Sequence, residues 1–140
     1  MKTLPSPAST KKRPKIGVIA ANLKHDDTTN ESRVELVVKN FGDSEATVHF
    51  QWTEILGGVE IDIPIVPSEV EIAQGQQMSV GVPIVDQSSY AAIWSGQTTL
   101  SARLTVTYVD ENRAATRYIF EGRVKAGSTS LETVRSSSNH

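Results

Sequence analysis

The sequence predicts an all-β domain: an antiparallel sandwich of two sheets, with about seven to eight strands. Apolar residues recur at every second position in segment after segment, helical periodicity is nearly absent, and the connections are short and rich in turn residues. Each such strand has one apolar face that only a second sheet can cover, which predicts a two-sheet sandwich. A closed barrel is the alternative arrangement.

Four segments of this kind lie in the N-terminal half. Val34, Leu36 and Val38 alternate with charged residues, so this strand has one dry face and one wet face. The third segment ends at Gly57-Gly58, a turn signal that predicts a hairpin. The predicted inward positions are Ile16, Val18 and Ala20, then Val34, Leu36 and Val38, then Ala46, Val48, Phe50 and Trp52, then Val59, Ile61, Ile63 and Ile65.

The C-terminal half contains four more segments. A short strand leads through a turn at Gly75 into a strand that includes Pro83, which lacks a backbone donor and therefore indicates a sheet edge or a bulge. The last two strands form a hairpin around the polar loop 110–113. The predicted inward positions are Val70 and Ile72, then Met78, Val80, Val82 and Ile84, then Leu100, Ala102, Leu104, Val106 and Tyr108, then Tyr118, Phe120, Gly122 and Val124.

One short helix is predicted near residues 88–95. The segment begins with serines, ends at Gly96, and places Tyr90 and Trp94 four residues apart on one side. One or two helical turns here would cap an open end of the sandwich.

The two ends of the chain differ in composition from its middle. Residues 1–14 contain three prolines and a basic run, and residues 126–140 are dominated by Ser, Thr, Asn and Gly. We expect a disordered basic N-terminal tail over 1–14, a single folded domain over 15–125, and a disordered Ser-rich C-terminal tail over 126–140.

The composition limits the classes of function that we expect. The 14 basic and 16 acidic side chains leave a formal charge of -2, which gives no general attraction for nucleic acid, so no nucleic-acid partner is expected. The absence of cysteine fits a reducing compartment. No apolar stretch suits a signal peptide or a membrane span, so we expect a soluble, cytoplasmic protein.

The strand pattern resembles the immunoglobulin-like superfamily, in particular its cysteine-free domains from prokaryotic proteins and vesicle-coat appendages. The resemblance covers about Lys15–Lys125. It is carried by the segment 34–40 with the Gly42 turn, by Trp52, by the hairpin around Gly75, and by the strand end at 107–110. No paired cysteines flank Trp52, which excludes an antibody-type domain. The resemblance implies the architecture and a tendency towards binding roles, and it carries over no functional residue.

The residues that could serve catalysis do not form a predicted site. The three histidines, His25, His49 and His140, fall in a loop, on a wet strand face and at the terminus, so a catalytic triad is not expected. Trp94-Ser95-Gly96 lacks the earlier glycine of a nucleophile elbow, because Ile93 stands in its place. We therefore expect no enzymatic activity and no cofactor, although a site shared with another subunit would keep an enzyme open as a third hypothesis.

Several charged or polar segments have a plain interpretation as solvated surface. The runs 25–27 and 110–112 lack the spacing and turn glycine of a calcium loop, so no metal is expected. Glu60, Asp62, Glu69 and Glu71 fall on solvent faces. The basic run 11–15 is better explained as a solvated tail than as a binding element. The sequon 30–32 would matter only in a secretory setting.

Two functions from different classes remain. The first is a non-catalytic protein-interaction or structural module, binding another protein or a second copy of itself through an outward apolar patch on the first, second and sixth strands. The second is a carbohydrate-binding module that uses Tyr90 and Trp94 as a stacking platform. The predicted partner-binding residues are Ile19, Val37, Pro83, Tyr90 and Trp94, with Ala21 and Gly81 in the same patch.

Overall fold

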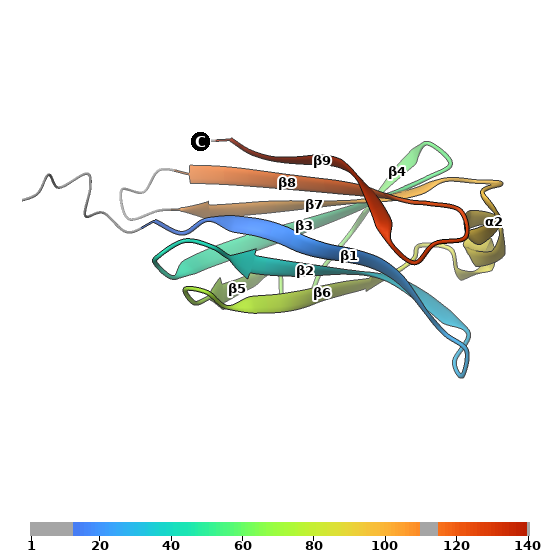
Figure 1. Cartoon of the computed structure of the whole chain (residues 1–140), viewed down its shortest axis with the longest axis horizontal. Coiled ribbons are helices and arrows are strands. Elements are labelled where there is room, and N and C mark those ends of the chain that lie inside the picture. Colours follow the sequence, from blue (N-terminus) through green and yellow to red (C-terminus); the bar gives the residue numbers. More distant parts are fainter. Residues whose placement is uncertain (1–12, 110–114, 140) are drawn as a thin grey trace, which may run out of the picture.

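The computed structural model describes residues 13–109 and 115–139 and forms two antiparallel sheets packed face to face (Figure 1). The strands are β1 (Ile16–Asp26), β2 (Glu31–Asn40), β3 (Ala46–Leu56), β4 (Val59–Ile63), β5 (Glu69–Ile72), β6 (Gln77–Pro83), β7 (Leu100–Val109), β8 (Ala115–Val124) and β9 (Leu131–Asn139). The smaller sheet has the order β1-β2-β6, and the larger has the order β4-β3-β7-β8-β9 with β5 also paired to β3. The predicted all-β, two-sheet sandwich is confirmed.

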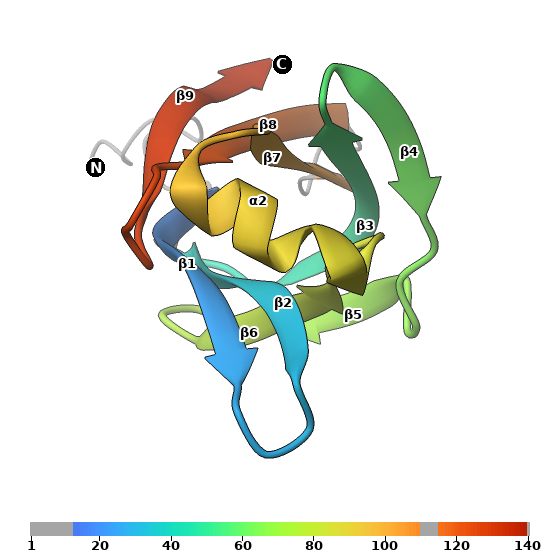
Figure 2. The same cartoon turned by 90° about the vertical axis from the view of Figure 1, so that its right-hand side faces the viewer.

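The short helix is also confirmed. A 3-10 turn, η1 (Gln87–Ser89), continues into α2 (Tyr90–Ser95), which lies across one end of the sandwich (Figure 2). Gly96 ends the helix in the left-handed conformation, with φ of 84°, and its N–H donates to the carbonyls of Ala92 and Ile93. The side chain that caps the start of the 3-10 turn belongs to Asp86, not to the serines that the sequence suggested.

The C-terminal segment differs from the prediction of a disordered tail over 126–140. Residues Leu131–Asn139 form β9, which pairs with β8 and adds a ninth strand in the described part of the chain. Its side chains are mostly small and polar, so the strand lacks the apolar face that reveals a strand in sequence. Polar pairing helps to hold it, because the hydroxyls of Tyr118 and Ser136 lie 2.7 Å apart. Residues 1–12 and the loop 110–114 lie outside the described residues.

A β-bulge in β1 changes which of its residues face the core. Val18 pairs with Val38, but Ala20 pairs with Val37, so Ile19 is the extra residue on β1. Because side chains alternate with a period of two, one extra residue reverses the phase of the rest of the strand. The prediction that Ala20 faces inward and Ala21 outward is therefore wrong: Ala21 packs partly buried against the core, and Ala20 shares the outer face with Val37.

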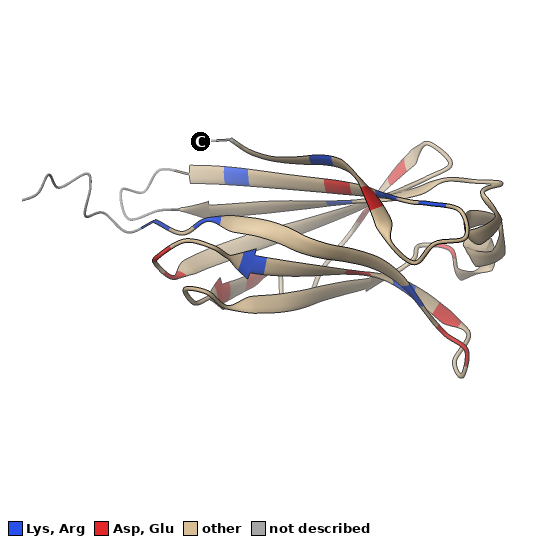
Figure 3. Cartoon of the chain, viewed as in Figure 1, with Lys and Arg blue, Asp and Glu red and all other residues tan. Residues whose placement is uncertain are grey.

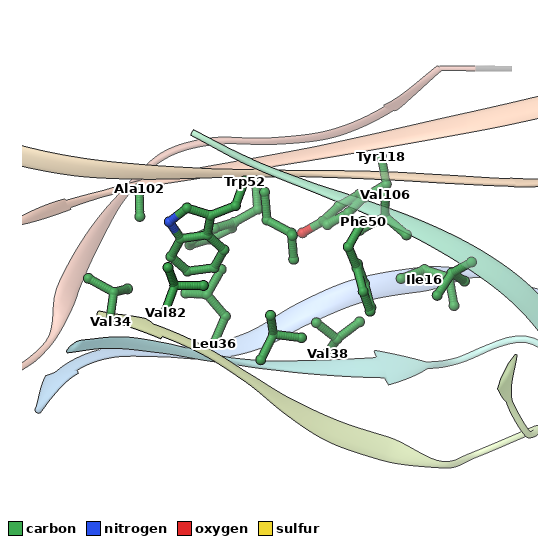
Figure 4. Packing of buried hydrophobic residues seen from close by; sticks show 14 of the residues in the cluster. Ile16, Val34, Leu36, Val38, Phe50, Trp52, Val82, Ala102, Val106 and Tyr118 are labelled. Atoms are coloured by element: carbon green, nitrogen blue, oxygen red, sulfur yellow. The ribbon is translucent and has the colours of Figure 1, made fainter. Parts of the chain in front are cut away.

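The core is centred on Trp52, which is 1% exposed. Its indole extends from β3 of the larger sheet towards Val34, Leu36 and Val82 of the smaller sheet (Figure 4). The predicted inward positions on β2, β3, β7 and β8 are buried. On β4 the prediction holds less well, because Val59 is 60% exposed and Ile61 and Ile63 are only partly buried.

Two tyrosines close the outer edge of β1. The N–H of Ile16 donates to the hydroxyl of Tyr108 at 3.4 Å, and the N–H of Val18 donates to the hydroxyl of Tyr118 at 3.1 Å. Further along, the N–H of Leu23 donates to the carbonyl of Thr129 at 2.7 Å. Groups of the larger sheet and of the segment before β9 thus cover backbone donors at the edge of the smaller sheet.

Candidate partner-binding surfaces

The three strands that were predicted to share a partner-binding patch are neighbours in the smaller sheet. Their registers place Ala20 opposite Val37 and Val37 opposite Ser79, so these three side chains form one row across the outer face. Ile19, in the bulge, is 46% exposed beside this row. The centre of the face is therefore made of small or apolar side chains where a solvent face ordinarily carries charge.

Charged residues lie along this face towards the end of the β1–β2 hairpin. Glu35 forms ion pairs with Lys24 at 2.9 Å and with Arg33 at 3.2 Å. The hydrogen bond from Lys24, and then that from Arg33, lowers the pKa of the Glu35 carboxyl. Arg33 also lies over Gly81: a Cβ placed on that glycine would be 3.1 Å from the guanidinium. An apolar centre with a charged rim is thus assembled from three strands.

Phe41 extends the apolar surface at the opposite end. It follows β2, is 51% exposed, and lies against Gly17 of β1, where an added Cβ would be 3.2 Å from its ring. The ammonium of Lys39 lies 5.2 Å from the ring centroid, within the range of a cation–π contact. The sequence analysis did not single out Phe41.

Pro83 ends β6 at the free side of the smaller sheet, as its missing donor indicated. It pairs with Arg33, and within residues 13–109 and 115–139 β6 pairs with no strand other than β2. The N–H of Ile84 donates to the carbonyl of Ser32, which places the even-numbered residues of β6 in the ladder with β2. The ring nitrogen of Pro83 therefore faces away from β2, and the proline removes no hydrogen bond from the sheet.

Tyr90 and Trp94 lie together at the helical end of the sandwich. The ring of Tyr90 stacks on His25 at 4.2 Å between centroids and on Trp94 at 6.3 Å. Tyr90 packs partly buried against the core, whereas Trp94 is 37% exposed. Two protein rings already flank Tyr90, so the pair does not form an open two-ring platform of the kind that stacks on sugars.

A serine, a histidine and an aspartate meet beside this cluster without the geometry of a catalytic triad. His25 Nδ1 lies 2.6 Å from Ser32 Oγ, and its Nε2 lies 3.6 Å from a carboxylate oxygen of Asp27. Ser32 is 0% exposed, and its N–H and carbonyl are both bonded to the side chain of Gln87. A substrate has no access to this hydroxyl. The two hydrogen bonds between the Ser32 backbone and Gln87 join the hairpin to η1.

The other catalytic candidates stay apart. His49 is exposed on the outer face of β3, and the hydroxyl of Ser95 donates to the carbonyl of Ala92 within its own helix. His140 lies outside the described residues, as does the acidic loop 110–112. The carboxylate of Asp26 accepts the N–H of Thr28 at 2.8 Å, as in a solvated turn.

Glu54 is a buried acid that the sequence analysis did not single out. It is 0% exposed at the end of the inward series that runs through Trp52 on β3. Its carboxylate accepts the N–H of Val85 at 2.7 Å and the indole N–H of Trp52 at 3.2 Å. Burial raises the pKa of this carboxyl, and the two hydrogen bonds oppose that effect. The alternation along β3 was a signal that could have located it.

Comparisons with known proteins add little. No family model and no curated protein matches the chain. Among solved structures it is similar to the crystal structure of a Bordetella pertussis protein named as a candidate ApaA, with a TM-score of 0.46 and 15% identity over 89% of this chain and 97% of that chain. A likeness this distant carries no argument about function. Within residues 13–109 and 115–139, no helix is long and apolar enough to cross a membrane.

Proposed function

We propose that this chain is a non-catalytic, immunoglobulin-like protein-interaction module that binds a partner protein through the outer face of β1, β2 and β6. The observation that carries the proposal is the row of Ala20, Val37 and Ser79 across three paired strands, with Ile19 exposed beside it. Such a face is smooth, because none of its central side chains is long or charged. It suits a partner that presents a flat apolar surface.

The ion pairs at the rim support the same function. Lys24 and Arg33 both pair with Glu35, so each of these three charges beside the apolar centre has an opposite charge next to it. A partner can cover the centre without burying an unpaired charge, which would otherwise be costly. The salt bridges at the exposed rim contribute specificity and orientation more than affinity.

The test is a charge placed at the centre of the face. Val37→Glu keeps the inward side of β2 unchanged, and we expect its free energy of unfolding to fall by about 1 kcal/mol or less. The matched control is Gln51→Glu, which adds the same charge at an exposed position on β3 of the other sheet. Both variants and the parent are used as bait in quantitative affinity capture from the native source, followed by titration of each recovered protein.

A partner that binds the parent and Gln51→Glu equally, and Val37→Glu at least about tenfold more weakly, supports the proposal. Equal binding by all three proteins removes this face as the binding surface. Denaturation curves of the three proteins show whether any loss reflects unfolding instead of a blocked surface.

A further inference from the structure

The free edge of β6 presents backbone groups that have no partner. Because the even-numbered residues of β6 bond to β2, the N–H and C=O groups of Gln77, Ser79 and Gly81 point away from the sheet. All three residues are exposed, and within the described part of the chain no group bonds to these outward N–H and C=O groups. Such a row is a template for another strand.

The other edges of the sandwich are protected in ways that β6 is not. Tyrosine hydroxyls and Thr129 cover donors of β1. The edge strands of the larger sheet carry charges, Glu60 and Asp62 on β4 and Glu132 and Arg135 on β9. No residue of β6 is charged, and its ribbon lacks both charge colours in Figure 3. Charged side chains are a common means by which edge strands avoid pairing, and β6 lacks them.

An apolar hollow lies beside this edge. It has a volume of about 200 Å³ and lies between the chain segment that joins β4 to β5 and the residues of β6. Val66 and Pro67 line it from that segment, and Met78, Ser79 and Gly81 line it from β6. Val66 is 92% exposed, so a large apolar side chain stands in solvent next to unpaired backbone. A strand that pairs with β6 would cover both features.

We propose that the occupant of this edge is a second copy of the chain, with the two β6 strands paired antiparallel about a two-fold axis. The sequence of β6 suits this arrangement. In the register that overlaps the two strands fully, Ser79 of each copy lies opposite Gly81 of the other, and the two residues exchange both of their hydrogen bonds. Gln77 then lies opposite Pro83, whose carbonyl accepts a hydrogen bond although the proline donates none.

The charges around the edge are compatible with self-pairing. The paired strands carry no charge, and the nearest cations on the outer face, Lys39 opposite Gln77 and Arg33 opposite Pro83, belong to β2. The Arg33 guanidinium lies over Gly81 of its own copy, so it is the cation nearest to the proposed contact. Glu35 pairs with Arg33.

Sedimentation of the full chain over about 1 µM to about 1 mM tests the proposal. We expect reversible dimers in the parent and, in Gly81→Pro, a Kd raised roughly tenfold or more, because each copy loses one outward donor and gains a ring at the contact. The N–H of Gly81 does not bond to β2, so the substitution leaves the internal ladder complete. A parent that stays monomeric over the whole range, or a Gly81→Pro variant that dimerises as well as the parent, overturns the proposal.

Cysteine cross-linking keeps the test decisive should Gly81→Pro fail to fold. The chain has no cysteine, so Ser79→Cys and Gly81→Cys introduce unique thiols. Opposed residues of an antiparallel pair have Cα atoms within disulfide range, and we expect an oxidised mixture of the two variants to form the heterodimer. Thr47→Cys, on the exposed face of β3, is the control partner for Ser79→Cys and should not cross-link. Equal cross-linking in both mixtures overturns the proposed register.

This self-association uses the edge of β6, whereas the proposed function uses the outer face of the sheet. The Val37→Glu variant should therefore dimerise like the parent, whether or not it still binds a partner protein through the face. Failure of one proposal is thus distinguishable from failure of the other.

Discussion

Replacing Trp52 tests the packing of the sandwich most directly. The indole is 1% exposed between the sheets, and its N–H donates to the buried carboxylate of Glu54 at 3.2 Å. Trp52→Ala removes both the apolar volume and the donor. The lost packing costs roughly 3–5 kcal/mol, and a buried acceptor that loses one of its donors adds about 1–3 kcal/mol.

The sum, about 4–8 kcal/mol, is comparable with the whole stability of a small domain, about 5–15 kcal/mol. We therefore expect Trp52→Ala to be partly or wholly unfolded at room temperature. Trp52→Phe keeps most of the ring volume and removes the donor, so its cost should be intermediate. Gln51→Ala, an exposed neighbour on the other face of β3, should cost about 0.5 kcal/mol or less.

The assay is urea denaturation followed by far-UV circular dichroism, because fluorescence would lose one of the two tryptophans of the chain. A Trp52→Ala midpoint as high as that of Gln51→Ala would refute the assignment of Trp52 to the core. A Trp52→Phe midpoint equal to that of the parent would show that the hydrogen bond to Glu54 adds nothing to stability.

Three further predictions follow from buried polar groups and from the helical end. Burial raises the pKa of Glu54, so between its ordinary pKa and its raised pKa the folded state holds a proton that the unfolded state releases. The free energy of unfolding should therefore fall as the pH rises through this range, and in Glu54→Gln it should fall less steeply. Asn40→Ala should lower the free energy of unfolding, measured by urea denaturation, by about 2–4 kcal/mol, because the buried amide donates to the carbonyls of Ser44 and Ile72. A loss below about 0.5 kcal/mol would contradict the stabilising role of these hydrogen bonds. In Trp52→Phe, where Trp94 is the only tryptophan, acrylamide quenching should be partial and unaffected by an oligosaccharide panel; saturable protection by one glycan would revive the carbohydrate-binding alternative.

Most of the strands were predictable from sequence because apolar and polar residues alternate along them. The eight expected segments coincide with β1 to β8, and the inward residues of β2, β3, β7 and β8 are the buried ones. β9 was not predictable in this way, since its serines carry no apolar face and the strand depends on pairing with β8. An alternating apolar pattern indicates burial on one side, and it does not reveal a strand that is held mainly by backbone and hydroxyl pairing.

The site was less predictable than the fold because two of its features are not periodic. The bulge at Ile19 shifts the register by one residue, and nothing in the alternation before it marks that position. As a result Ala20 replaced Ala21 in the outer row, while Val37 kept its expected place. Buried polar residues such as Ser32 and Asn40 likewise look like surface residues in sequence, and only their hydrogen bonds across the fold explain their burial.

The incomplete burial of β4 and the unpaired edge of β6 have a common origin in the unequal size of the two sheets. The smaller sheet ends at β6, so it does not extend far enough to cover the apolar side chains of β4 and of the segment after it. Ile63, Ile65, Val70 and Met78 are all only partly buried against the core on this side. A strand added to β6 would widen the smaller sheet towards these residues. Pairing at this edge would therefore supply backbone hydrogen bonds and apolar cover together, which is the combination that makes strand addition favourable in water.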